Sequence, residues 1–245
     1  MKTLYAGPWI GEFGWELTMF NPIVRAEARH YDRVVVASHA ASEYLYEFAD
    51  EFIPLEARGH AMHTGTLISP KPVPHPTHDM RIEPTVVNAK NRGDWKKEYI
   101  RLGSSRNGNT PIMFAFRPPK PIRDKNPMRK AYPPEMCKKL VSMLPKGYAY
   151  GGPDNWIFQD MMDLRGMDLE TQCDILSMAT VAIGPSSGTM HLASLCGCPH
   201  VTWCDHANVR KRYEANWNPF ATPVRYLKGI PSPEEVVEAA KEIMR

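Results

Sequence analysis

The sequence of 245 residues has no long apolar run, no strong excess of charge of either sign and few cysteines. No stretch approaches the roughly twenty consecutive apolar residues of a membrane-spanning helix, so we expect no transmembrane segment. Residues 1–7 are too short for a signal peptide and are followed at once by Pro8, so we expect a cytoplasmic protein. A formal net charge of +3, from 30 basic and 27 acidic residues, does not by itself demand nucleic acid or a membrane surface as partner.

Metal-binding patterns are also weak. The cysteines are odd in number and fall mostly within predicted helices or strands of the second half, so we predict buried, reduced thiols: Cys137, Cys173, Cys196, Cys198 and Cys204. The pair at 196 and 198 lacks the second pair that a zinc site needs. His60-x-x-His63 and His75-x-x-His78 flank proline-rich sequence rather than a helix face. We therefore predict no metal site.

The first half alternates short apolar strands with helical patterns. The predicted strands are 3–6, 33–37 and 52–55, and the predicted helices are 15–30, 42–51 and 94–102. Residues 64–84 are rich in Pro and His and predict a loop. Gly103–Thr110 is the most linker-like stretch, and we place a boundary there between domains 1–105 and 106–245.

The second half repeats the alternation. The predicted strands are 111–116, 148–150, 181–183 and a further buried strand that ends at Trp203, and the predicted helices are 133–144, 169–178, one that ends at Gly197, and 233–244. Strands that alternate with helices favour parallel sheets. The predicted fold class is therefore α/β, with two Rossmann-like, doubly wound parallel-sheet domains and an active-site cleft between their facing carboxyl edges.

The stretch 181–203 is the most informative of the chain. A buried strand is followed by Ser186, Ser187, Gly188 and Thr189 and then by a mostly apolar helix. At a helix N-terminus, small residues let an anion approach the backbone N–H groups, and the helix dipole favours negative charge. The stretch predicts a diphosphate site, with an ordinary Ser-capped helix as the open alternative.

Residues 181–203, with 168–179 before them, resemble the donor-binding region of the heptosyltransferase-like glycosyltransferases, family nine, of GT-B fold. The family pattern is similar to an acidic residue or Pro, Ser/Thr, Gly, x, x, His-Leu-Ala-x-x-x-Gly-x-Pro. Here its places are filled by Ser186, Ser187, Gly188, Thr189, His191, Leu192, Ala193, Gly197 and Pro199. The acidic residue often found before the Ser/Thr is Pro185 here, so its role is not carried over.

The resemblance implies a compact GT-B enzyme that transfers a sugar from a nucleotide-diphosphate sugar, which is a co-substrate, with no cofactor. Domain 106–245 would bind this donor, and domain 1–105 would lie on the acceptor side. Arg117 and Lys120 follow a predicted strand at the edge of Ser186–Thr189 and are candidate diphosphate ligands, a solvated loop being the alternative. Gly151, Gly152 and Asp154 resemble the family's Gly-Gly-x-x-Asp/Glu turn near the nucleotide, or form a plain turn.

Two carboxylates of the first half lie where a predicted strand turns into a helix. Sugar transfer needs a base that takes a proton from the acceptor. Glu12 is the first candidate because it lies in the glycine-spaced turn 7–14, Glu16 is the second, and His39, after the next strand, is the third. Trp15 belongs to the same stretch and is assigned to the acceptor side. A charge favoured by the helix dipole is the alternative for Glu12, and a cap or loop contact for Glu16.

The acceptor stays open. Basic and aromatic residues interleave in 204–220, so Arg210 and Arg212 are candidates for gripping a saccharide, another polar acceptor or nucleic acid from a loop. The chain has no Asp-x-Asp pair, which the other large glycosyltransferase fold uses to hold a metal on its donor, so we expect metal independence. Transfer to a modified base in DNA, a nucleotide-sugar 2-epimerase and a non-catalytic nucleotide-sugar binding protein remain alternatives. The sugar and the oligomeric state are open.

Overall fold

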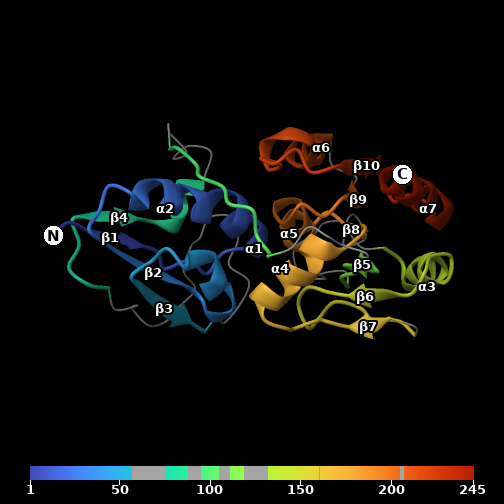
Figure 1. The fold of residues 1–245 in the computed structure, drawn as a ribbon, viewed down its shortest axis with the longest axis horizontal. Helices are drawn as coiled ribbons and strands as arrows, with labels where there is room; N and C mark the ends of the chain where they lie inside the picture. The colour runs from blue at the N-terminus through green and yellow to red at the C-terminus, as the bar shows by residue number, and fades with distance from the viewer. Residues whose placement is uncertain (57–74, 88–94, 105–110, 119–131, 160, 205–206) are drawn as a thin grey trace. The chain divides into compact units, whose positions relative to one another are not determined.

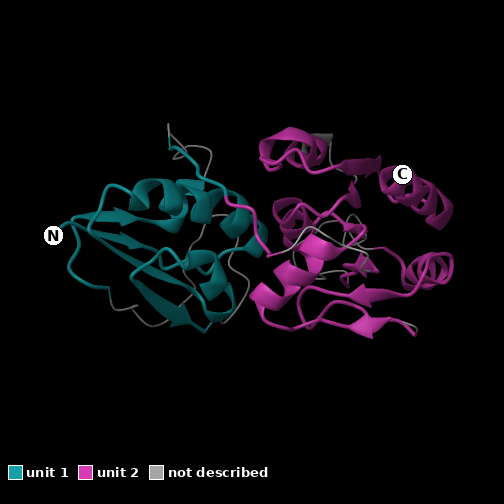
Figure 2. Cartoon of the chain, in the orientation of Figure 1, with its two compact units in different colours: residues 1–99 teal, residues 100–245 magenta. Residues whose placement is uncertain are grey.

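The structure is a computed structural model that describes residues 1–56, 75–87, 95–104, 111–118, 132–159, 161–204 and 207–245. The chain divides into two compact units, which are residues 1–99 and 100–245 (Figure 2). The predicted boundary between residues 105 and 106 lies outside the described residues.

Unit 1 contains a four-stranded sheet in which all strands are parallel (Figure 1). Its strands are β1 (Thr3–Ala6), β2 (Arg33–His39), β3 (Glu51–Leu55) and β4 (Met80–Ile82), in the order β3-β2-β1-β4. The first three confirm predicted strands, and β3 lies at an edge as expected. The fourth lies within residues 64–84, so the loop predicted there is wrong at 80–82; a strand of only three residues in Pro- and His-rich sequence gives little local signal.

The helical segments of unit 1 are α1 (Phe13–Trp15), the π-helix η1 (Glu16–Phe20), α2 (Asn21–Ala28) and two 3-10 helices, η2 (Ala40–Tyr46) and η3 (Pro84–Val87). The first three run on without a break and confirm the helix predicted at 15–30. The helix predicted at 42–51 is wrong. Only a 3-10 helix forms there, because the Ser42 and Tyr46 hydroxyls donate to the Glu16 carboxylate and the Asp50 carboxylate accepts from the N–H of Val34, at 2.7 Å.

The helix predicted at 94–102 is also wrong for its described residues. The chain from residue 95 to 102 has no helix or strand. Its backbone bonds run to other segments instead, since the N–H of Glu98 donates to the carbonyl of Pro22 at 2.9 Å and that of Leu102 to the carbonyl of Leu195 at 3.1 Å. Tertiary hydrogen bonds thus replace the intrahelical ones.

Unit 2 contains a six-stranded sheet that is also parallel throughout. Its strands are β5 (Ile112–Phe114), β6 (Gly147–Ala149), β7 (Met162–Asp163), β8 (Ala182–Pro185), β9 (His200–Cys204) and β10 (Val224–Lys228), in the order β10-β9-β8-β5-β6-β7. The edge strands β7 and β10 were missed. β7 is exposed and β10 is only half-buried, so neither carries the apolar run of a buried strand.

The helices of unit 2 follow the sequence closely up to residue 204. They are α3 (Pro134–Ser142), α4 (Leu169–Met178), α5 (Gly188–Cys196), α6 (Ala207–Lys211), the π-helix η5 (Arg212–Asn216) and α7 (Pro233–Met244). Gly197 ends α5 as expected, in the left-handed conformation at φ 76°, and Ser232 starts α7 through a capping box. The loop predicted over 204–220 is wrong, because α6 and η5 occupy most of it.

The helices of unit 2 cover both faces of the sheet. Helix α3 packs with α7, and α4 with α5, on opposite sides of the strands (Figure 1). Alternate strand residues, among them Phe114, Ile183 and Trp203, form one buried core with α3 and α7. All five cysteines are buried and free, as predicted. No helix among the described residues has both the length and the apolar character to cross a bilayer.

The strand orders identify the fold class. Counted in chain order, unit 2 has the order 3-2-1-4-5-6 of a doubly wound sheet, and unit 1 has the shorter order 3-2-1-4. In such sheets, ligands bind at the carboxyl ends of the strands where the order reverses. These switch points lie between β1 and β4 in unit 1 and between β5 and β8 in unit 2. The prediction of two Rossmann-like domains is confirmed; the cleft between them stays a prediction.

Candidate active site

The switch point of unit 2 brings together two of the predicted donor-binding segments. Strands β5 and β8 are neighbours, and the N–H of Ala115 donates to the carbonyl of Ile183 at 2.9 Å. Arg117 follows three residues after the end of β5, and Ser186 follows β8 directly. Because parallel strands end at the same edge of a sheet, both residues lie at the carboxyl edge. Lys120 lies outside the described residues.

The first turn of α5 offers two backbone donors. Ser187 caps the helix, and its hydroxyl accepts from the N–H of Met190 at 3.3 Å. The N–H of Ser187 itself donates to the Tyr213 hydroxyl at 3.0 Å. The N–H groups of Gly188 and Thr189 have no acceptor among the described residues. With the positive end of the helix dipole, they form a suitable site for an anion.

Arg117 can add a full positive charge to this edge. The residue is half-buried, and none of the ion pairs within the described part of the chain includes it. A guanidinium group presents two parallel donors that match the oxygens of a phosphate. A contact of Arg117 with a diphosphate stays a prediction.

The glycine turn after β6 packs against the start of α5. Gly151 has φ +98°, and a Cβ there would lie 2.5 Å from Asn155 Nδ2 and 3.0 Å from Thr189 Cγ2, so only glycine fits. Its N–H donates to Gln172 Oε1 at 2.9 Å, which ties the turn to α4. The structure thus brings Gly151 to Thr189. Gly152 and Asp154 are exposed beside them.

The His191 side chain lies in the interior of unit 2 rather than at the carboxyl edge of the sheet. The side chain is buried, and its ring stacks on Tyr213 with centroids 4.1 Å apart and meets Trp217 edge-on at 4.8 Å. In this structure the imidazole packs α5 onto η5. A direct contact between His191 and the donor stays a prediction.

In unit 1, the loop after β1 crosses the carboxyl ends of neighbouring strands. The N–H of Gly7 donates to the carbonyl of Ile82 at 2.9 Å, and that of Trp9 to the carbonyl of Ala37 at 2.8 Å. A Cβ on Gly11 would lie 2.6 Å from the buried Trp9 ring. Close packing by Trp9 and Gly11 therefore holds this loop at the switch point.

Glu12 belongs to this loop, and His39 contacts it. Glu12 is exposed and precedes α1; its carbonyl, not its side chain, caps the helix by accepting from Trp15 and Glu16 at 3.0 and 3.1 Å. His39 Nε2 lies 3.1 Å from the carbonyl oxygen of Gly11 and must donate to it, since a carbonyl only accepts. The first and third base candidates therefore lie at the same loop, Glu12 exposed and His39 half-buried, whereas the neighbouring Trp15 is buried.

Glu16 has a different environment. Its carboxylate is fully buried and accepts from the hydroxyls of Ser38, of Ser42 at 2.9 Å and of Tyr46 at 3.0 Å. Burial raises the pKa of Glu16, and the nearby His39 and the three hydroxyls partly oppose this. The contacts join η1 to β2 and η2. This arrangement supports the structural alternative for Glu16, and its role as a base stays a prediction.

We expect Glu16→Gln to lower the free energy of unfolding by about 1–3 kcal/mol, because the amide has two N–H donors where the carboxyl group has at most one, which leaves a neighbouring hydroxyl without an acceptor. The effect should depend on pH. Because the pKa of Glu16 is raised in the folded state, the folded protein keeps this proton when the unfolded chain has lost it. Wild-type stability should therefore fall, relative to the variant, as the pH rises above the ordinary glutamate pKa of about 4.3. Urea unfolding of both proteins from pH 4 to pH 8 measures this, and parallel curves would contradict it.

No family model matches the sequence, and no curated protein matches it in sequence. Solved structures do match. A family 9 glycosyl transferase from Veillonella parvula is 12% identical with a TM-score of 0.61, over 99% of this chain and 97% of that one. The ADP-heptose LPS heptosyltransferase II of E. coli is 14% identical with a TM-score of 0.57, over 100% and 98%. The E. coli heptosyltransferase WaaC with ADP is 12% identical with a TM-score of 0.57, over 99% and 100%.

The chain has the fold of these glycosyltransferases. The resemblance seen in residues 168–179 and 181–203 is thereby confirmed for the fold. At 12–14% identity, the similarity shows the fold and not the substrates of this chain.

Arg210 and Arg212, assigned to the acceptor side, lie on α6 and η5. Arg210 is exposed and pairs with Glu214 at 2.7 Å, and Arg212 lies over the Trp217 ring at 4.6 Å from its centroid. An isolated exposed ion pair such as that of Arg210 is worth little in stability. A contact of either arginine with an acceptor stays a prediction.

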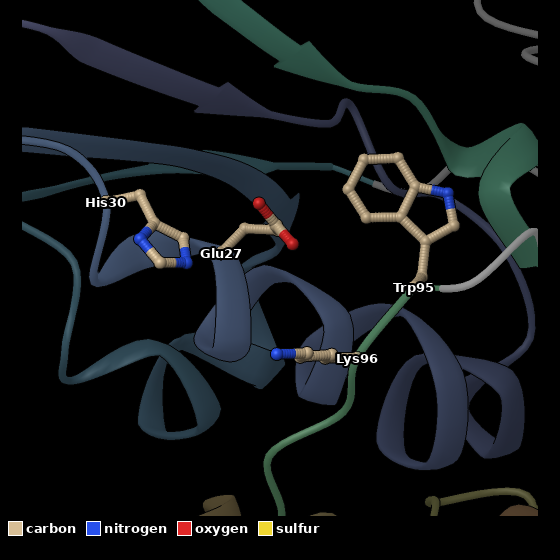
Figure 3. Close-up of a pocket in the computed structure, with 4 residues that line it drawn as sticks. All are labelled: Glu27, His30, Trp95 and Lys96. Carbon is tan, nitrogen blue, oxygen red and sulfur yellow. The ribbon is translucent and has the colours of Figure 1, made fainter.

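A surface cavity of about 340 Å³ is lined by Glu27, His30, Trp95 and Lys96. In the view of Figure 3, the Glu27 carboxylate lies between the rings of His30 and Trp95. Glu27 and His30 lie where α2 returns to the start of β2, which is the amino edge of the sheet. No predicted site residue lines this cavity.

The histidine pairs give no metal site within the described residues. His75 and His78 pack against the Tyr5 ring at 5.5 and 5.6 Å, and no group of three or more His, Cys, Asp or Glu that could hold a metal occurs in the described ranges. His60 and His63 lie outside the described residues.

Two supporting residues carry no signal in the sequence. Gln172 joins α4 to the Gly151 turn, and Tyr213 joins η5 to the Ser187 turn. Both act through side chains that reach segments more than 20 residues away in the chain. No local pattern signals such contacts, although the aromatic character of 204–220 pointed to the segment that holds Tyr213.

Proposed function

We propose that this protein is a glycosyltransferase that moves a sugar from a nucleotide-diphosphate sugar to a hydroxyl group of a polar acceptor, without a metal ion. The observation that carries the proposal is the switch point of unit 2. There the start of α5, with the Gly188 and Thr189 amides, and Arg117, three residues after β5, lie at one edge of a doubly wound sheet. Such donors suit the diphosphate of a nucleotide sugar.

In the proposed reaction, Glu12 takes the proton from the acceptor hydroxyl. The acceptor oxygen forms a bond to the anomeric carbon of the sugar, and the bond between that carbon and the diphosphate oxygen breaks. The electron pair leaves with the nucleoside diphosphate. The amides of α5 and Arg117 stabilise the charge that develops there, which is the role a metal has in other enzymes of this chemistry.

The comparisons support the donor class. The matched E. coli WaaC structures are described as containing ADP and ADP-2-deoxy-2-fluoro heptose, and the second is 12% identical with a TM-score of 0.53. Here a saccharide is the first acceptor class to test, and a modified base in DNA the second, because α6 and η5 carry basic side chains.

A ligand screen tests the proposal directly. We expect at least one of ADP-, GDP- and UDP-sugars to raise the midpoint of thermal unfolding, because a ligand that binds only the folded state stabilises it. Turnover with that sugar should release free nucleoside diphosphate together with a glycosylated product. An epimerised sugar without nucleotide release would indicate the 2-epimerase, and binding without turnover a binding protein; either result would refute the proposal.

Activity should survive a chelator. We expect the rate to change by less than about twofold in EDTA, because helix-terminus amides and a guanidinium group would neutralise the leaving diphosphate. The measurement is nucleotide release with and without EDTA, then after adding Mg²⁺ or Mn²⁺. Loss of activity that a divalent metal restores would contradict metal independence and redirect attention to the histidine pairs.

A further inference from the structure

The hydroxyl group of Tyr213 lies against the turn that precedes α5. It accepts from the N–H of Ser187 at 3.0 Å and donates toward the carbonyl of Ser187 at 3.1 Å, and it lies 3.4 Å from Ser186 Oγ. One side chain thus contacts both backbone polar groups of the residue that caps the helix. The contact reaches across 26 positions of the chain.

The ring of Tyr213 fixes the same turn from the side. It is fully buried and stacks on His191, a residue of α5, with the two ring planes only 13° apart. The ring of His200, on β9, lies 5.8 Å away. Tyr213 therefore holds the cap and the first turn of α5 between η5 and the sheet, and it has little freedom to move.

The N–H groups at the start of the helix differ in whether they already have an acceptor. Ser187 is extended, at φ −158° and ψ 170°, and its N–H is occupied by Tyr213. The next two N–H groups, of Gly188 and Thr189, are left for a ligand within the described part of the chain. Burial raises the pKa of Tyr213 to about 12, so its hydroxyl stays protonated at neutral pH and keeps its donor proton.

We propose that Tyr213 is a positioning residue of the donor site: it holds Ser187 so that the amides of Gly188 and Thr189, and not that of Ser187, face the diphosphate. This rests on the proposed function. It also gives η5 a role different from gripping substrate, since its residue Tyr213 contacts Ser186 and Ser187.

The test is Tyr213→Phe, which keeps the ring that stacks on His191 and removes only the hydroxyl. Tyr226→Phe is the matched control, because the Tyr226 hydroxyl also donates to a backbone carbonyl of unit 2, that of Cys204 at 2.9 Å. Both variants should lose some stability. Only Tyr213→Phe should weaken the binding of ADP, GDP or UDP, by about tenfold for whichever binds wild type, as expected for loss of one hydrogen-bonded support. Binding of the parent nucleoside should change by less than about twofold.

Hydrogen exchange provides a second readout that needs no ligand. In Tyr213→Phe, the Ser187 amide should exchange at least about tenfold faster than in wild type, whereas it should keep its protection in Tyr226→Phe. Unchanged exchange, unchanged diphosphate affinity or tighter binding in Tyr213→Phe would each overturn the role of Tyr213. If wild type binds none of the three diphosphates, the proposed function and the positioning role both fail. Wild-type binding that Tyr213→Phe leaves unaltered refutes the positioning role alone.

Discussion

Replacing Glu12 by Gln is expected to lower the rate of sugar transfer by about a hundredfold to ten-thousandfold, the usual contribution of a general base. Gln has the size of Glu and keeps one acceptor oxygen, but it cannot take the acceptor's proton at neutral pH. Since the Glu12 side chain is exposed and its carbonyl makes the helix-capping bonds, the substitution should leave the fold intact. Steady-state kinetics, donor affinity and the unfolding midpoint together measure the effect.

Two further variants make the result for Glu12 specific. Glu43→Gln removes the same charge from another exposed position of unit 1 and should leave the rate within about twofold. His39→Gln removes the alternative base at the same edge and should cost less than Glu12→Gln. A normal rate in Glu12→Gln together with a large loss in His39→Gln would transfer the role of base to His39. A large fall in the thermal unfolding midpoint of Glu12→Gln would show that Glu12 stabilises the fold and would leave its role as a base unsupported.

Replacing Arg117 by Ala is expected to weaken the binding of nucleoside diphosphates by about 10- to 150-fold, because hydrogen bonds to a charged group contribute about 1.5–3 kcal/mol. The parent nucleoside lacks the phosphates that a guanidinium group would bind, so its affinity should change by less than about twofold. Titration calorimetry with the diphosphate and with the nucleoside measures both losses on the same protein.

Arg225→Ala is the matched control for Arg117. Arg225 lies on the edge strand β10 and pairs with Glu242 at 3.1 Å, so its removal takes the same charge from the same unit without touching the switch point. We expect it to leave both affinities within about twofold. Equal losses of diphosphate and nucleoside affinity in Arg117→Ala would show that Arg117 does not bind the diphosphate. Equal effects of Arg117→Ala and Arg225→Ala would show that only the net charge of the unit matters, and not the position of Arg117.

Much of the fold is readable from local sequence. The helices at 169–178 and 233–244 match α4 and α7, because an acidic or hydroxyl cap, apolar spacing and, in α7, Pro in the first turn are all local signals. The same holds for the strand, turn and helix that lead from β8 into α5. For this reason both the anion-binding turn and the family resemblance can be recognised in the residue pattern of 181–203 alone.

The failures share one physical cause, which is that long-range contacts override local preference. Residues 42–51 have a helical pattern, but the buried carboxylate of Glu16 holds their hydroxyl groups in a 3-10 helix. Residues 95–102 bond to Pro22 and Leu195 instead of to themselves. Strands β4, β7 and β10 gain their hydrogen bonds from a neighbouring strand, so their own short or exposed sequences carry almost no signal.

By itself, the sequence determined the alternation of strands and helices, the capped start of α5 and the candidates Glu12 and Arg117, because each follows from neighbouring residues. Only the tertiary structure decided which candidates share an edge. It buried Glu16 under three hydroxyls, left Glu12 exposed in a loop that His39 contacts, and placed Tyr213 against Ser187. Strand order and side-chain contacts between distant segments depend on how the whole chain packs, and no local window of sequence contains that information.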